Sequence, residues 1–213
     1  MLKKLFAAAL VAAFLILPVS SAAPVQFEAA SYPEQGYRPG NVPAQTDAAE
    51  SMSPALHALV LALLNHDVDS FTFEDASLNW EILYNMLSLY GQLDSRSVAE
   101  QGELFLLEET VLDYAAALSC DLTNAYGRLG AVPAAVRDRL NYDNVSGCYT
   151  VVCGTDDLSQ LRVDSLSASG SGCAVTGSLV YQVNGRVLAR FQADLTVRDN
   201  MFGYAVTGVR VTV

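Results

Sequence analysis

The sequence predicts an α+β fold, in which about three N-terminal helices pack on one face of a five- to six-stranded antiparallel meander sheet. Between residues 53 and 140 the apolar residues recur at helical spacing, and over residues 145–213 they alternate with polar residues, as in strands. Charge divides the chain at the same place: residues 24–144 hold 18 acidic residues and five Arg, whereas residues 145–213 hold five of each. We therefore expect one domain, residues 53–213, with a helical layer followed by a sheet.

Residues 1–22 have the pattern of a secretory signal peptide. Two lysines precede residues 5–19, an uncharged apolar run, and small residues then lead to Ala22. The run is shorter than the roughly 20 apolar residues of a membrane span, and no cysteine follows it to carry a bacterial lipid anchor. We expect cleavage between Ala22 and Ala23 and a secreted, bacterial protein that has no membrane attachment after cleavage.

Residues 23–52 predict a disordered arm. They contain four prolines and two glycines, and their apolar residues follow neither the helical nor the strand period. Such a segment cannot bury enough apolar surface to offset the entropy lost on ordering. The folded domain is expected to start at residue 53.

The first two predicted helices each have a clear start. Ser53 provides a helix cap and Pro54 fits the first helical position. The apolar face that follows consists of Leu56, Leu59, Val60, Leu63 and Leu64. A second helix follows Thr72 to Asp75, whose spacing matches a capping box, and Gly91 is expected to end it. Its buried face is predicted to hold Leu78, Ile82, Leu83, Met86 and Tyr90.

A short strand is predicted over residues 104–107, ahead of a third helix. Glu108 and Glu109 place negative charge at the start of that helix, where its dipole favours it, and apolar spacing continues to about Cys120. Pro133 is expected to start one or two further helical turns that end near Leu140.

Five strands are expected to form the meander. They lie around residues 149–153, 161–168, 173–183, 187–197 and 204–213. The second changes faces between Val163 and Leu166, which predicts a β-bulge. Asn184-Gly185 predicts a two-residue hairpin into the fourth strand. The inward side of the fourth strand is predicted to carry Val187, Ala189, Phe191, Ala193, Leu195 and Val197.

This order of elements resembles that of the NTF2-like and cystatin-like α+β folds. The resemblance covers about residues 53–213 and rests on the order of helices and strands alone. Such folds include enzymes, binding proteins and scaffolds, so the resemblance implies an architecture and does not imply an activity.

Composition disfavours several partners. Lys3 and Lys4 are the only lysines, so the chain after cleavage carries ten Arg against 23 acidic residues, a formal charge of −13. Attraction to phosphate backbones and anionic lipids depends on clustered basic residues. We therefore expect no nucleic acid and no membrane partner.

The four cysteines form an even set in a chain that carries an export signal, where disulfides can persist. Cys148 and Cys153 would lie about 16 Å apart on one strand, at about 3.3 Å per residue, too far to pair with each other. Two pairings remain: Cys120–Cys148 with Cys153–Cys173, or Cys120–Cys153 with Cys148–Cys173. The second is favoured, because antiparallel turns bring Cys148 and Cys173 to the same end of the sheet. A third alternative is that all four stay reduced.

No group of residues predicts catalysis or metal binding. The predicted inward strand positions carry no charge, so the sheet offers a pocket neither an acid nor a base. His57 borders the apolar face of the first helix, and His66 lies at its end, where the helix dipole favours it. We assign no catalytic residue, no metal and no cofactor, and we do not expect an enzyme.

Two hypotheses of function remain. The first is a secreted, non-catalytic module that binds a protein, a glycan or a cell-wall component through Arg186, Arg190 and Arg198, which alternate along the fourth strand with Asp194 between them. The alternative is a small-ligand carrier or an enzyme with an apolar pocket between helices and sheet. The aromatic residues proposed to line that pocket are Trp80, Tyr84, Tyr114 and Tyr181.

Overall fold

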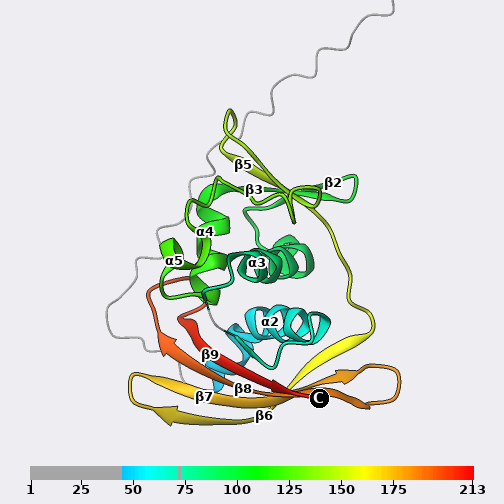
Figure 1. Ribbon diagram of the computed structural model, residues 1–213, viewed down its shortest axis with the longest axis vertical. Coiled ribbons are helices and arrows are strands. Elements are labelled where there is room, and N and C mark those ends of the chain that lie inside the picture. The colour runs from blue at the N-terminus through cyan, green and yellow to red at the C-terminus, as the bar shows by residue number, and fades with distance from the viewer. Residues whose placement is uncertain (1–44, 72) are drawn as a thin grey trace, which may run out of the picture. The chain divides into compact units, whose positions relative to one another are not determined.

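The computed structural model describes residues 45–71 and 73–213 (Figure 1). This part of the chain has an α+β fold with two antiparallel sheets and helices between them. The predicted signal peptide and most of the predicted arm lie outside the described residues. Within the described residues, no helix combines the length and the apolar character needed to span a bilayer.

The larger sheet has the strand order β1-β9-β8-β7-β6, and all its neighbours are antiparallel. Its strands are β1 (Ser70–Phe71), β6 (Ser159–Ser169), β7 (Gly172–Tyr181), β8 (Val187–Val197) and β9 (Tyr204–Thr212). The last four form the predicted meander, and the predicted bulge in β6 lies between Val163 and Ser165. We call this the five-stranded sheet.

The smaller sheet was not foreseen as a separate unit. Its order is β2-β3-β5-β4. Its strands are β2 (Val98–Glu100), β3 (Glu103–Leu107), β4 (Leu140–Asp143) and β5 (Cys148–Val152). The prediction that β5 begins the meander is wrong, because β5 pairs on one side with β3 and on the other with β4. Residues 153–158 then lead the chain to the other sheet.

The described residues contain five α-helices and one 3-10 turn, rather than the three helices expected. They are α1 (Gln45–Ser51), α2 (Ser53–Asn65), α3 (Ala76–Tyr90), the 3-10 turn η1 (Gly91–Leu93), α4 (Glu108–Leu118) and α5 (Leu122–Tyr126). The arm boundary at residue 52 is too late, because α1 precedes it and Ala48 and Met52 are fully buried. No regular helix follows Pro133, but consecutive hydrogen-bonded turns continue to Leu140, whose N–H donates to the carbonyl of Val136.

Helix α2 is buried on nearly all sides. It contacts β6 to β9 on one side and α3 on the other, and α3 contacts β5 of the smaller sheet (Figure 1). Eight of its residues are buried, including His57. A single apolar stripe was expected, but a helix between two layers buries more than one face.

The meander shows the predicted alternation in its centre. Ala189, Phe191, Ala193 and Leu195 are buried, and the residues that alternate with them, Arg190, Gln192 and Asp194, are exposed. The inward row is shorter than expected, because Val187 and Val197 at its ends are exposed. Phe191 lies opposite Gly177 on β7, where a Cβ atom would come within 2.6 Å of the Phe191 ring. Gly177 thus leaves the space that the ring fills.

Candidate functional site

The three arginines predicted to form a binding row do not meet at one place. Arg190 faces outward within β8, whereas Arg186 lies in the turn before β8 and Arg198 follows its end. Twelve residues of extended chain would separate the outer two by about 40 Å. Only Arg190 therefore belongs to the centre of the outward face.

Two other arginines, which the sequence did not single out, share that face. Strand register places polar residues in two adjacent cross-strand rows. One row is Arg162, Ser178, Arg190 and Thr212, and the next is Ser165, Thr176, Gln192 and Arg210. Adjacent rows on one face of a sheet lie about 7 Å apart. We call these eight residues the outer sheet face.

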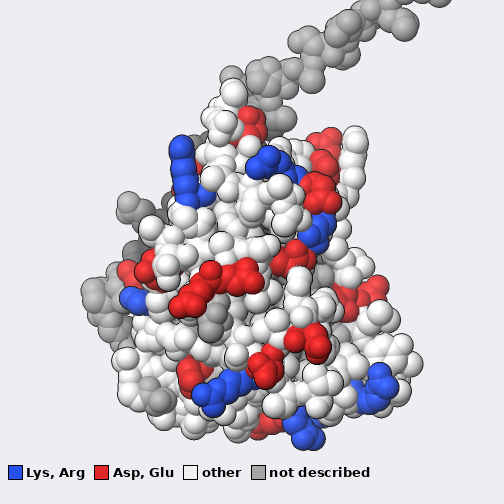
Figure 2. All heavy atoms as spheres, viewed as in Figure 1, with Lys and Arg blue, Asp and Glu red and all other residues white. Residues whose placement is uncertain are grey.

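Charges on and around the outer sheet face are mixed but locally basic. Arg162 pairs with Asp164 at 3.1 Å between Nε and Oδ1, and Asp194 lies beyond Gln192 on β8. Arg190 and Arg210 form no ion pair with a described residue. In Figure 2, blue and red spheres are interspersed along the lower edge, where the five-stranded sheet lies, while red spheres gather over the middle of the molecule. Two guanidinium groups on this face are thus available to an anion.

Ser178 lies between Arg162 and Arg190 and is fully buried, and its Oγ has no hydrogen-bond partner. A small residue on an outward face is buried when longer neighbouring side chains cover it. Arg162 and Arg190, which flank it on the neighbouring strands, are exposed.

The outer sheet face also borders a hollow of about 380 Å³ at the β1 edge. It is lined by Ser70, Phe71, Gln192, Asp194, Gly208, Val209 and Arg210. Arg210, Gln192 and Asp194 of β8 and β9 are among these residues, so the hollow offers a bound ligand both a cationic and an anionic side chain.

The aromatic residues predicted to line an internal pocket have separate environments. Trp80 is buried and packs edge-on against Tyr126, with ring centroids 5.6 Å apart. Tyr114 packs in the same way against Phe202, at 5.3 Å. The Tyr84 ring lies 4.5 Å from the guanidinium carbon of Arg139.

Tyr181, the fourth predicted residue, is half-buried at the end of β7. These contacts account for Trp80, Tyr84 and Tyr114 as parts of the core and its border, and they do not support a shared pocket.

All four cysteines are free. Cys120 is exposed, Cys153 is half-buried, and Cys148 and Cys173 are buried. Neither of the two crossed pairings is formed. The pairing of Cys148 with Cys173 was expected because both would lie in one meander. The structure places Cys148 in the smaller sheet and Cys173 in the five-stranded sheet.

A buried cluster around His57 links α2, α3 and the connection between the sheets. Nδ1 of His57 is hydrogen-bonded to Oη of Tyr90 at the end of α3. Nε2 lies 3.0 Å from Oγ of Ser159 and 3.2 Å from Oδ2 of Asp156. The hydroxyl of Ser159 donates to Asp156 Oδ2, and two backbone N–H groups, of Leu158 and Ser159, donate to Asp156 Oδ1.

These contacts are satisfied together by a neutral His57 that carries its proton on Nε2. Burial lowers the pKa of His57, and the nearby Asp156 carboxylate offsets part of that effect. Burial, with a smaller contribution from Asp156, raises the pKa of Tyr90 to about 12, so this phenol keeps its proton and donates it to Nδ1. For Asp156, burial raises the pKa, but the hydrogen bonds from Ser159 and Leu158 outweigh it and lower the pKa overall.

The cluster contains Ser, His and Asp but does not have the geometry of a nucleophilic triad. In a triad the hydroxyl and the carboxylate contact opposite nitrogens of the imidazole. Here both contact Nε2, and the Ser159 hydroxyl donates to Asp156 rather than to His57. Ser159 is also buried. The arrangement holds residues 156–159 against the two helices and does not activate Ser159.

A shallow hollow of about 210 Å³ lies beside this cluster. It offers polar and apolar surface in similar amounts and is lined by His57, Leu89, Tyr90, Gln92, Gly154, Thr155, Asp156 and Asp157. Among the described residues, no group of His, Cys, Asp and Glu has the geometry of a metal site. The size and lining of the hollow suit a small polar molecule.

Comparisons with known proteins identify no relative. No family model, no curated protein and no solved structure matches the chain.

Proposed function

We propose that this protein is a secreted, non-catalytic binding module whose outer sheet face binds an anionic glycan of the cell surface or cell wall. The observation that carries the proposal is the pair of adjacent rows in which Arg162, Arg190 and Arg210 stand among hydroxyl and amide groups. The chain is acidic overall, so this local concentration of arginine is distinctive.

The chemistry of these residues suits a glycan that bears carboxylates. The planar fork of Arg matches a carboxylate with two parallel hydrogen bonds. The Thr, Ser and Gln side chains between the arginines can exchange hydrogen bonds with sugar hydroxyls. The two rows hold no aromatic or large aliphatic side chain, the kind of anchor that dominates protein–protein interfaces. A carbohydrate acid therefore fits this face better than a protein does.

The predicted leader supports an extracytoplasmic location, where such glycans occur. The formal charge of −13 after cleavage disfavours nucleic acid and anionic membranes as alternative partners. We also propose that α2, α3 and the meander β6 to β9 follow the order of elements in NTF2-like and cystatin-like folds. This resemblance concerns topology alone.

A small-ligand carrier or enzyme is the second candidate, and the hollow beside His57 favours it. That hollow offers polar groups beside its apolar surface, and Trp80 and Tyr84, which were expected to line the apolar pocket, do not line it. A ligand there would meet the Asp157 side chain and the Tyr90 ring, beside a histidine that already has both nitrogens engaged.

Binding of the full chain to polygalacturonate, with neutral dextran as the control polymer, tests the main proposal. We use about 0.15 M salt, because charges beyond about 8 Å are then screened and the net charge of the chain matters less. We expect binding to polygalacturonate alone, and a loss of about tenfold or more in Arg190→Gln/Arg210→Gln, because each arginine provides a charge-assisted hydrogen bond.

The matched control is Arg186→Gln/Arg198→Gln, which removes the same charge at the two ends of β8 and should bind nearly as well as the natural chain. Equal binding to the two polymers, or equal losses in the two double variants, would show that the outer sheet face is not the binding surface.

A further inference from the structure

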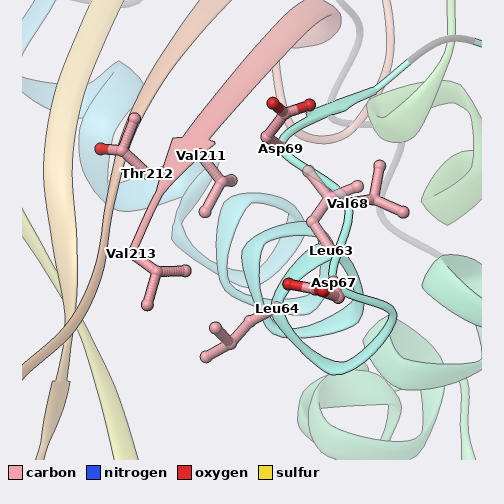
Figure 3. A pocket seen from close by; sticks show the side chains of 8 residues that line it. All are labelled: Leu63, Leu64, Asp67, Val68, Asp69, Val211, Thr212 and Val213. Atoms are coloured by element: carbon pink, nitrogen blue, oxygen red, sulfur yellow. The ribbon is translucent and has the colours of Figure 1, made fainter.

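A second recess lies where helix α2 ends beside the last residues of β9 (Figure 3). Its volume is about 310 Å³. It is lined by Leu63, Leu64, Asp67, Val68, Asp69, Val211, Thr212 and Val213. We call it the α2–β9 groove. It adjoins the outer sheet face at Thr212, but its floor uses the inward-facing Val211, whereas Arg210 of the outer sheet face points outward.

The floor of the α2–β9 groove is apolar. Leu63 and Val211 are buried, and Leu64 and Val68 are half-buried. In Figure 3 the side chains of Leu64 and Val211 point toward the space between α2 and β9. An aliphatic chain lying in the groove would therefore cover apolar surface that water now reaches.

The rim of the groove is negative. The side chains of Asp67 and Asp69 are exposed, and neither forms an ion pair with a described residue. The C-terminal end of α2 lies at the same place, and the carbonyl end of a helix favours a cation. Three independent sources of negative potential thus surround one apolar recess.

Asp67 occupies a backbone conformation that glycine adopts more easily. Its φ is 55°, and the N–H groups of Asp67 and Val68 donate to the carbonyls of Leu64 and Leu63. This is a Schellman motif, in which the residue at the Asp67 position is usually Gly. The chain thus places a carboxylate at the groove where a residue without a side chain would fit with less strain.

We propose that the α2–β9 groove binds a lysine or arginine side chain from an exposed segment of a partner protein. The aliphatic stem lies on Val68, Val211 and Leu64, and the cationic head lies between Asp67, Asp69 and the carbonyl end of α2. Long basic side chains combine an apolar stem with a charged tip, which is the combination that this groove complements. The proposal does not depend on glycan binding, because the two surfaces share only Thr212, and the charged residues Asp67 and Asp69 lie outside the outer sheet face.

The test is a titration of the isotope-labelled full chain, followed by amide NMR, with the peptide acetyl-Gly-Leu-Lys-Leu-Gly-amide. The comparison peptide is the same sequence with acetyl-lysine, which keeps the stem and removes the charge. We expect shifts at Val68, Asp69 and Val211, and binding of the lysine peptide that is about tenfold tighter, as two exposed charge pairs would give.

The matched variants separate the groove from general charge. Asp67→Asn/Asp69→Asn should lose about tenfold in affinity for the lysine peptide, and it should stay folded because Asn also accepts positive φ. Asp138→Asn/Asp199→Asn removes the same charge elsewhere and should bind as the natural chain does. Equal affinity for the two peptides, equal losses in the two variants, or shifts outside the groove would each overturn the proposal.

Discussion

At the scale of single residues, His57 shows how burial and hydrogen bonding set a protonation state. Its ring is 5% exposed, Tyr90 donates to one nitrogen, and Asp156 and Ser159 contact the other. An imidazole surrounded in this way fixes two helices and the connection between two sheets at one point. We infer that its main role is structural, because each of its nitrogens already has a partner.

Protonation of His57 should therefore destabilise the fold. Burial lowers the pKa of His57 from 6.5, so the unfolded chain binds a proton at a higher pH than the folded chain does. The stabilisation is complete above about pH 6.5 and is lost as the pH falls through the lowered pKa of the folded state. Urea unfolding at pH 7.5 and pH 5 should show the loss.

The control for this effect is His57→Gln, which keeps a donor and does not titrate. Its free energy of unfolding should change less between the two pH values than that of the natural chain. The same dependence in both proteins would assign the pH effect to other groups. The lowered pKa of Asp156 acts in the same direction, but its window lies below its ordinary value of 3.8.

The sequence could not predict this cluster. His57 was singled out as bordering an apolar face, but Tyr90 is 33 positions away and Ser159 is 102 positions away. Contacts at such separations depend on how the layers stack, and no local spacing encodes them. The one local signal was the Asp156 to Ser159 spacing, in which a carboxylate accepts from backbone N–H groups and ends a turn.

At the scale of elements, alternation predicted the strands of the meander well and their partners less well. Strand β8 has the expected buried residues from Ala189 to Leu195 because they face helix α2 across one side of the sheet. Strand β5 has an equally regular pattern, yet it belongs to the other sheet. The period of a strand shows which of its residues share a face, but it does not specify the neighbouring strand.

The register of β8 can be tested with two neighbouring truncations. Phe191 is buried against Gly177, so Phe191→Ala should reduce the free energy of unfolding by about 3–5 kcal/mol. Arg190 is exposed on the other face, and Arg190→Ala should stay within about 0.5 kcal/mol of the natural chain. Urea melts of both variants measure the difference. A larger loss for Arg190→Ala would mean that the strand is shifted by one residue, and equal small losses would mean that Phe191 is not in the core.

At the scale of the whole molecule, the helices of the described residues lie between two sheets, and this arrangement explains why a helix can be buried on more than one side. Helix α2 contacts the five-stranded sheet and α3, so it is apolar on more than one side. The sequence indicated both helices and strands but not the second sheet, because the strands that form it are short and separated by helices.

Among the described residues, the same arrangement leaves one face of the five-stranded sheet without helices (Figure 1). The chain places five of its ten arginines after residue 145, in or beside this sheet. Sequence alternation correctly placed Arg190 on that face. It missed Arg162 and Arg210, because a residue's neighbours on adjacent strands depend on register, and three register shifts in the sheet change which residues lie opposite one another.

The location of a bound anionic oligosaccharide on the molecule tests the central claim most directly. The measurement is amide and guanidinium NMR of the labelled full chain during titration with a short oligogalacturonate. We predict that the perturbed signals belong to the outer sheet face, with Arg162, Arg190 and Arg210 changing most and the residues around His57 unchanged. Perturbation centred on Tyr90 and Asp157, with the three arginines unaffected, would contradict the claim and place the ligand in the hollow beside His57.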